Sequence, residues 1–330
     1  MNADMHIDRP TRRSERLSSR RADGLDVAAE VRPAIAARRL RRVEALGMNL
    51  DLGSVDCFLN EVEDALVRRR RTRVFYHNLH TLYLYYRDNS LRRHYQRAVV
   101  MADGMPLIWL LRILGTAARR EDRVTWVDLI WPLLERARAR GWRVFYVGGS
   151  EPVITAGLAA IRERLPALEI DGHHGYFDDA VDPSISPLVQ RINAFKPDLC
   201  IVGIGSPRQE RWITTCQARI AAPVIMASGS CIEYIADHVK TPPRWMGRWG
   251  IEWSYRLWRD PRRFAHRYLV EPWLLMALMC RYGLRSASGR VRRSHEESST
   301  TPGSGRPMTG NTRGLRPPAA PSPTTPETRR

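Results

Sequence analysis

Arg143–Pro152 has the sequence RVFYVGGSEP, and this stretch decides the predicted fold. Its first half, Arg143–Val147, is a short run rich in β-branched and aromatic side chains, which is typical of a buried strand. Gly148 and Gly149 permit a tight turn, and Pro152 fits the first turn of a helix because no backbone N–H is needed there. The stretch therefore predicts a β-strand that leads directly into an α-helix.

The same pattern recurs along the chain. Further strands are predicted at Arg73–Tyr76, Ala98–Ala102, Leu168–Ile170, Leu199–Val202 and Val224–Ala227. Helical patterns lie between strands, notably at Val127–Arg140, Pro152–Leu165 and Pro207–Arg219. Strands that alternate with helices indicate an α/β fold with a parallel sheet. Ligands of such sheets bind beyond the carboxyl ends of the strands, where this chain carries Asn, Asp and Gly residues.

Composition limits the class of protein. Of the 330 residues 43% are apolar, which is enough for a packed core, and the formal net charge of +18 implies an anionic partner. Nucleic acid, anionic lipid and phosphate-bearing substrates all satisfy this charge. The five cysteines form no CxxC pair, and no apolar run reaches the ~18 residues of a membrane-spanning helix. Because the N-terminus lacks the apolar segment of a signal peptide, we expect a cytoplasmic protein.

Composition also divides the chain into four parts. Residues 1–45 are rich in Arg, Ala and Ser and predict a disordered basic arm, with a nascent helix near Val27–Leu46. Residues 46–238 carry the strand–helix pattern of the main domain, and residues 239–285 form an appendage rich in Trp and Arg. Residues 286–330 are rich in Ser, Thr, Pro and Arg, and a disordered tail is expected because they cannot bury enough apolar surface.

Two polar residues that follow predicted strands could carry chemistry. Asn78 comes after His77 at the end of the first strand, and Asp103 follows the run AVVMA directly. The Asp103 carboxylate could act as a general base, since partial burial would raise its pKa. It could equally cap the helix that begins near Met105. The local sequence favours neither role over the other.

Two glycine-rich turns are candidate binding loops. Gly148 and Gly149 end a strand where a helix begins, an arrangement that can bind a phosphate or serve as an ordinary turn. In the stretch GIGSPRQE, Gly203 and Gly205 occupy a second such turn before another proline-initiated helix. Either loop could hold a diphosphate.

Three further side chains are candidates for contact with a substrate. Gln209 could bind sugar hydroxyls or a uracil edge, since its amide both donates and accepts hydrogen bonds. Glu210 could face the same crevice or only complement the N-terminus of its helix. Arg123 could bind a diphosphate, although its acidic neighbours in EDRVT also allow a surface ion pair.

Half of the ten tryptophans lie between residues 244 and 273, interleaved with arginines. They are Trp245, Trp249, Trp253, Trp258 and Trp273, and the first three recur at every fourth position, as on one stripe of a helix. Tryptophan at a headgroup interface, with arginine at lipid phosphates, is typical of a peripheral membrane segment. A core-packed helix with a basic face, or an interface for single-stranded nucleic acid, has the same composition.

No metal site and no cofactor are predicted. The chain has no HExxH motif, no Cys/His cluster and no Asp-x-Asp motif, so arginines and backbone N–H groups would have to meet any leaving-group charge. The full GxGxxG fingerprint of a dinucleotide oxidoreductase is also absent. A basic nucleic-acid-binding protein is a second alternative, but it leaves Asn78, Asp103 and Gln209 without a role.

Taken in order, these segments resemble the WecG/TagA/CpsF family of bacterial glycosyltransferases. The resemblance covers roughly residues 48–272 and is carried by AVVMADGMPLIW, EDRVTWVDL, VFYVGGSEPV, HHGYF, GIGSPRQERWI and TPPRWMGRWGIEWSYRLWRDPRRFAHRY. It implies a Rossmann-like domain, a parallel sheet with helices on both faces, followed by a C-terminal helical appendage that associates with the membrane. It also implies an inverting, metal-independent transfer from a UDP-sugar to an undecaprenyl-diphosphate-linked sugar in cell-envelope or exopolysaccharide biosynthesis.

The resemblance assigns roles to individual residues. Asp103 matches the proposed general base, and Asn78, Arg123 and Gln209 match positions of the family's pocket motifs. Arginines of the appendage, Arg244, Arg256, Arg262 and Arg263 among them, are expected at the lipid diphosphate. The implied partners are a UDP-sugar, a polyprenyl-diphosphate-linked sugar and an anionic membrane surface, with no nucleic acid. The protein would lie on the inner face of the cell membrane, and a homo-oligomer is an expectation from the family alone.

Several positions depart from the family pattern. Tyr76 stands where the family often has Thr, and Trp126 stands where Gly is common after Arg-Val-Thr. Glu233 and Asp237 replace the usual Asp and Gly of their segment. These departures leave the donor sugar open among N-acetylmannosamine, its uronic acid and glucose.

Overall fold

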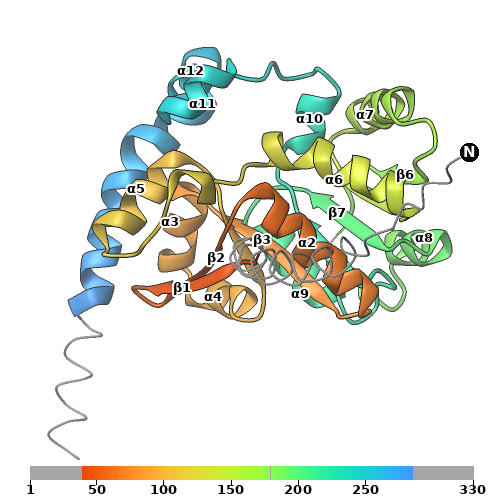
Figure 1. Cartoon of the computed structure of the whole chain (residues 1–330), viewed down its shortest axis with the longest axis horizontal. Helices are drawn as coiled ribbons and strands as arrows, with labels where there is room; N and C mark the ends of the chain where they lie inside the picture. The colour runs from red at the N-terminus through yellow and green to blue at the C-terminus, as the bar shows by residue number, and fades with distance from the viewer. Residues whose placement is uncertain (1–38, 179, 285–330) are drawn as a thin grey trace, which may run out of the picture. The chain divides into compact units, whose positions relative to one another are not determined.

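Six parallel strands form the centre of the fold. The computed structural model describes residues 39–178 and 180–284, and the sheet has the strand order β4-β3-β8-β7-β5-β6 (Figure 1). The strands are β3 (Thr72–His77), β4 (Val99–Ala102), β5 (Val144–Gly148), β6 (Ile170–His173), β7 (Leu199–Gly203) and β8 (Val224–Ala227). Each overlaps a predicted strand, so the prediction of an α/β fold with a parallel sheet is confirmed.

Helices cover both faces of this sheet. On one face lie α2 (Val55–Val67), α6 (Trp126–Arg140) and α7 (Glu151–Arg164); on the other lie α3 (Leu79–Arg87), α4 (Asn89–Tyr95), α8 (Pro187–Phe195) and α9 (Arg208–Cys216). This division follows from the strand order, because right-handed crossovers place helices on opposite faces when the chain moves in opposite directions along a sheet. Every residue of β5, β7 and β8 is buried, as expected for strands covered on both sides.

A β-hairpin precedes the sheet. Its strands, β1 (Arg41–Ala45) and β2 (Met48–Leu52), pair antiparallel, and the Asp51 carboxylate joins the hairpin to β4 by accepting a 2.8 Å hydrogen bond from the Val100 amide. Arg42 donates two 3.0 Å hydrogen bonds to the same carboxylate. The predicted basic arm of residues 1–45 therefore overlaps an ordered strand, and the predicted nascent helix is wrong for residues 41–45. The remainder of that arm, up to residue 38, and the predicted tail of residues 286–330 lie outside the described residues.

Short helices follow the α/β core and build the appendage. They are α10 (Cys231–Ile235), α11 (Arg244–Trp249), α12 (Glu252–Arg259), α13 (Pro261–Ala265), the π-helix η2 (His266–Val270) and a helical stretch over residues 271–284. The last stretch packs on the core through Leu275 and Met279, which are buried. Farther along it, the Tyr282 ring lies 4.6 Å from the Arg92 guanidinium carbon of α4.

The predicted tryptophan stripe is divided between two helices. Helix α11 ends at Trp249, and Gly250 then adopts a left-handed conformation with φ 69° before α12 begins at Glu252. Trp245 and Trp249 are therefore not on one continuous helix with Trp253, and the prediction of a single stripe is wrong. Within residues 39–178 and 180–284, no helix has the length and apolar character needed to cross a membrane.

Candidate active site

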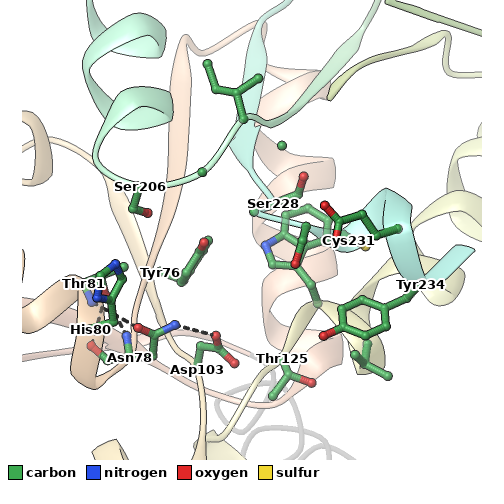
Figure 2. A pocket seen from close by; sticks show the side chains of 18 of the residues that line it. Tyr76, Asn78, His80, Thr81, Asp103, Thr125, Ser206, Ser228, Cys231 and Tyr234 are labelled. Carbon is green, nitrogen blue, oxygen red and sulfur yellow. Dashed lines mark hydrogen bonds between the residues drawn. The ribbon is translucent and has the colours of Figure 1, made fainter. Parts of the chain in front are cut away.

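The carboxyl ends of the parallel strands open into one cavity of about 390 Å³ (Figure 2). Residues that follow five different strands meet there: Asn78 after β3, Asp103 after β4, Gly149 after β5, Gly205 and Ser206 after β7, and Ser228 and Gly229 after β8. The location agrees with the rule that open α/β sheets bind ligands at this edge. The strand-end clustering seen in the sequence is thus present in three dimensions.

Asn78 connects the end of β3 to the end of β4. As the N-cap of α3, it accepts a 3.1 Å hydrogen bond from the Thr81 amide through Oδ1. Its Nδ2 donates a 3.1 Å hydrogen bond to Oδ2 of Asp103 (Figure 2). One side chain therefore both starts a helix and orients the carboxylate.

Asp103 does not cap the next helix. Helix α5 (Met105–Ile113) has Gly104 as its N-cap, and no side chain makes the capping hydrogen bond. Burial raises the pKa of Asp103, while the hydrogen bond from Asn78 and the positive charge of Arg256 oppose that rise. The Asp103 carboxylate therefore lines the cavity instead of capping helix α5. Its assignment as general base stays a prediction.

The two glycine loops differ in what they contribute. Gly149, Gly203 and Gly205 line the cavity, and Gly205 adopts φ 83°, which a residue with a Cβ rarely tolerates. Gly148 does not line it; a Cβ at this position would lie 2.6 Å from the carbonyl oxygen of Gly203 on the neighbouring strand. Gly148 therefore permits close packing between β5 and β7, and contact with substrate stays a prediction for the other three glycines.

Gln209 and Glu210 lie beneath the cavity. Both side chains are fully buried. The Gln209 Nε2 lies 3.1 Å from the Tyr76 hydroxyl and 3.0 Å from Ser206 Oγ, and its Oε1 accepts a 3.1 Å hydrogen bond from the Gly229 amide. The predicted direct contact with substrate is therefore replaced by a supporting role, in which Gln209 joins the loops after β7 and β8 to Tyr76.

Glu210 completes the same network from below. Its Oε1 accepts hydrogen bonds from Ser206 Oγ at 2.7 Å and from the Tyr95 hydroxyl at 3.3 Å, while its Oε2 is buried with no hydrogen-bond partner among the described residues. Burial raises the pKa of this carboxyl group. The sequence suggested a residue facing the crevice, but amphipathic spacing alone does not reveal which side of helix α9 faces the cavity.

Arg123 also lies behind the cavity rather than in its wall. Its guanidinium forms a 3.1 Å ion pair with Asp128 of α6, not with its neighbours in the chain. Asp128 in turn accepts a 2.8 Å hydrogen bond from the Thr125 hydroxyl, and Thr125 does line the cavity. Arg123 lines neither cavity, but its Nη1 is buried with no hydrogen-bond partner among the described residues, so its contact with a diphosphate stays a prediction.

Two arginines of the appendage reach the cavity. Arg256 of α12 and Arg267 of η2 both line it, and each has a buried Nε with no acceptor among the described residues. The Arg256 guanidinium lies over the Tyr234 ring at 5.6 Å. Buried donors without partners are groups whose hydrogen bonds an anionic ligand could complete. Arg256 was among the candidates from the sequence, whereas Arg267 was not distinguished from the other arginines of its segment.

The remaining predicted arginines do not meet there. Arg262 is exposed and lines no described cavity, while the side chains of Arg244 and Arg263 lie outside what the structure describes. Glu252 of α12 was missed entirely, yet it lines the cavity, and burial raises its pKa. Nothing in the residue pattern of the appendage separates Glu252 and Arg267 from their neighbours.

A second cavity, of about 350 Å³, adjoins the first. Its wall includes the apolar side chains Leu79, Met105, Pro106, Leu107, Trp109, Trp253, Tyr268 and Pro272. Both cavities share Asn78, His80, Asp103, Glu252, Arg256 and Arg267. A polar cavity and an apolar one therefore meet at the Asn78–Asp103 pair.

Three of the departures from the family pattern lie at the polar cavity. Tyr76, Trp126 and Glu233 all line it, and the Trp126 indole donates a 2.8 Å hydrogen bond to the carbonyl oxygen of Ala227. Asp237 adopts φ 53°, a left-handed conformation that glycine adopts without strain. The large side chains of Tyr76 and Trp126 narrow the space available to a ligand.

Comparison with known proteins agrees with this geometry. Residues 43–289 match the model of the glycosyl transferase WecG/TagA/CpsF family. The chain is 31% identical over 170 residues to the N-acetylglucosaminyldiphosphoundecaprenol N-acetyl-beta-D-mannosaminyltransferases of Staphylococcus aureus strains MW2, NCTC 8325 / PS 47 and MRSA252. The aligned region covers 52% of this chain and 65% of each of these relatives. Because the family match extends over most of its length, the chain belongs to the WecG/TagA/CpsF family of glycosyl transferases.

Proposed function

We propose that the protein transfers a sugar from a UDP-sugar to a sugar linked to undecaprenyl diphosphate. The observation that carries this proposal is the meeting of two unlike cavities at Asp103. The polar cavity, with its glycine loops, suits a nucleotide-sugar, and the apolar cavity suits the first units of a prenyl chain. The names of the Staphylococcus aureus relatives make N-acetylmannosamine the first donor to test and N-acetylglucosaminyl diphosphoundecaprenol the first acceptor.

The proposed chemistry is a single displacement with inversion. The acceptor hydroxyl attacks the anomeric carbon from the face opposite UDP, Asp103 takes the hydroxyl proton, and the bond between the anomeric carbon and the UDP oxygen breaks. General-base assistance of this kind contributes about 10²–10⁴-fold. Asn78 supports the step because its hydrogen bond fixes the orientation of the carboxylate.

In this proposal, arginine side chains stabilise the negative charge on the departing UDP. Arg256 and Arg267 face the junction of the cavities with donor groups that no described residue satisfies. Two guanidinium groups can stabilise a diphosphate through charge-assisted hydrogen bonds, so the transfer is expected to proceed without a divalent ion. Turnover that is lost in EDTA and restored by Mg²⁺ would contradict this part of the proposal.

We further propose that the appendage holds the enzyme on the inner face of the cell membrane. Trp245, Trp249, Trp258 and Trp273 are 55%, 71%, 76% and 68% exposed, and Leu269, Leu274 and Met276 are also exposed. Exposed aromatic and apolar side chains beside arginines suit the headgroup region of an anionic bilayer. Because Arg256 and Arg267 belong to the same segment, the active site would lie close to the lipid-linked acceptor.

The proposal is tested by measuring UDP release from a panel of UDP-sugars, with and without a prenyl-diphosphate-linked N-acetylglucosamine in vesicles. We expect release that depends on the acceptor and is confined to one donor. Product analysis by NMR would then show an inverted anomeric centre. Donor hydrolysis that is indifferent to the acceptor, or no release from folded protein with any donor, would refute the proposed reaction.

A further inference from the structure

Helix α5 carries an apolar stripe that leads from the candidate active site to the protein surface. The helix begins two residues after Asp103, and Met105, Trp109 and Ile113 follow one another at every fourth position, on one side of it. Their exposed fractions are 5%, 43% and 81% in that order. At about 1.5 Å per residue the stripe is about 12 Å long. It therefore has a buried end beside Asp103 and an exposed end that faces solvent.

A third cavity, of about 490 Å³, opens beside this stripe. This outer groove is lined by Met105, Trp109, Arg112, Arg120 and Trp249. Trp249 is 71% exposed and belongs to α11, which lies next to α5 (Figure 1). Met105 and Trp109 also line the apolar cavity. Two shared side chains therefore join the apolar cavity at Asp103 to a groove that opens at the surface.

The charge of the outer groove indicates what surrounds it. Its charged wall residues are Arg112 and Arg120, and no acidic residue of the described chain lines it. The Arg112 Nε donates a 2.8 Å hydrogen bond to the carbonyl oxygen of Ala118, which holds this side chain beside the end of α5. Arginines at the edge of an apolar surface suit lipid phosphates. A second copy of the chain, with its own net charge of +18, would bring positive charge against this face.

A long prenyl chain that enters the apolar cavity also has to leave it. At about 350 Å³ that cavity is too small for the whole of an undecaprenyl chain, so the rest of the chain must run on towards the bilayer. A route over apolar side chains costs less free energy than one through water. The stripe and the outer groove provide such a route, since they start at the wall of the apolar cavity and end at exposed apolar side chains beside arginines.

We propose that Met105, Trp109, Ile113 and Trp249 bind the prenyl chain of the lipid-linked acceptor between the apolar cavity and the bilayer. This inference rests on the proposed function for the identity of the acceptor. It assigns part of the lipid-binding surface to α5 of the α/β domain, in addition to the appendage. It also predicts that affinity depends on the length of the chain, because each added isoprene unit covers more of the stripe.

Chain length is the variable that tests this route. N-acetylglucosamine is linked through a diphosphate to chains of one to four isoprene units, and UDP release is measured without vesicles, below the concentrations at which these acceptors form micelles. For the wild type, KM for the acceptor should fall by about tenfold or more from the shortest chain to the longest, because more apolar surface is buried. The value of kcat should change little, since the reacting groups are the same.

Substitutions along the stripe should act at different chain lengths. Ile113→Ser, at the exposed end, should weaken binding of the longest chain and leave the shortest as in the wild type. Trp109→Ser should reduce the gain from shorter chains as well, because Trp109 lies nearer to Asp103. Trp109 also packs against Gly250, so urea midpoints of this variant are needed to show that the fold is retained.

Ile185→Ser is the matched control for Ile113→Ser. Ile185 is 65% exposed, precedes α8 and lines none of the three cavities, so its substitution should leave KM unchanged at every chain length. An equal loss in Ile113→Ser and Ile185→Ser would overturn the inference, because the effect would then not belong to the stripe.

Dimethylallyl, geranyl and farnesyl diphosphate provide a readout that does not depend on transfer. Their affinities, measured by calorimetry, should rise with chain length in the wild type and rise less in Trp109→Ser. That result without transfer to any acceptor would reject the proposed reaction and keep the route for the chain. Affinities and KM values that do not vary with chain length would overturn the inference while transfer itself continued. Dimers that Ile113→Ser dissociates would also overturn it, because a second copy of the chain would then cover the stripe.

Discussion

Nδ2 of Asn78 lies 3.1 Å from Oδ2 of Asp103, and the same asparagine caps helix α3 through its Oδ1. The two functions use different atoms, so they can be separated by substitution. Serine retains the cap but has no group that reaches Asp103, whereas alanine loses both. Asn78→Ser should therefore keep the wild-type free energy of unfolding and lower turnover about tenfold.

Asn78→Ala should lower turnover to a similar degree and also lower the free energy of unfolding by about 1 kcal/mol. Urea titration and UDP release, measured on both variants, provide the comparison. If turnover falls only where stability falls, Asn78 acts as a cap alone.

Asp103→Asn is the direct test of the general base. The amide is the same size and can still contact Asn78, so the fold should be retained. Turnover should fall by about 10²–10⁴-fold, while the affinity for UDP changes little. Single-turnover kinetics separate the chemical step from product release. Wild-type rates in this variant would remove Asp103 from the mechanism.

Arg256→Gln and Arg267→Gln should each weaken UDP binding and slow transfer, by about tenfold or more, because each removes a charged donor from the cavity junction. Arg259→Gln is the matched control. This arginine belongs to the same helix as Arg256 but is exposed and lines neither cavity. The measurement uses a soluble acceptor, so that membrane affinity does not enter. Equal losses in all three variants would indicate a general effect of charge.

Glu210→Gln tests the buried network through the pH dependence of stability. Burial raises the pKa of Glu210 above its value in the unfolded chain, so the folded state favours the protonated form. The wild type should therefore lose stability relative to Glu210→Gln as pH rises through the folded-state pKa. This loss of stability should be measurable as a fall in the wild-type urea midpoint, relative to that of Glu210→Gln, at several pH values between about 5 and 8. A difference in midpoint that does not vary with pH would mean that the carboxyl group keeps one protonation state throughout.

The exposed tryptophans of the appendage lead to a prediction about membrane affinity. The double substitution Trp249→Ser, Trp258→Ser should weaken binding to anionic vesicles by at least about tenfold, because each indole would lose its burial at the headgroup region. Val67→Ser removes an equally exposed apolar side chain at the end of α2 and should leave vesicle binding unchanged. Flotation at two salt concentrations measures both variants. Unaltered flotation of the double variant would assign membrane binding to another surface.

The sequence predicted most of the sheet because its strands are buried on both faces. Apolar runs such as Leu199–Val202 are unambiguous when a glycine turn and a proline-initiated helix follow them. The hairpin β1–β2 was missed because Arg41 and Arg42 make its first strand look like part of a basic arm. Its order depends on Asp51, whose bond to the Val100 amide joins segments far apart in the chain.

Site residues could be predicted from the sequence only where they directly follow a strand. Asn78 and Asp103 reach the cavity because the parallel sheet brings their strand ends together. Gln209 was predicted to point its side chain into the cavity, but the side chain packs against the neighbouring loops instead. Local spacing does not say whether a side chain faces a ligand or the loops beside it. Glu252, Arg267 and His80 depend on how the appendage packs against the core, and no periodicity encodes that packing.

The left-handed turn at Gly250 gives the appendage a further consequence. By ending one short helix and starting another, it allows a single stretch of chain to carry outward-facing tryptophans and, a few residues later, the inward-facing Glu252 and Arg256. The proposed membrane-binding surface and two side chains of the candidate active site therefore lie on one short stretch of chain. On the proposed function, exchanging this stretch between family members should transfer membrane binding and acceptor preference together, while the strand ends should keep the donor preference of the recipient enzyme.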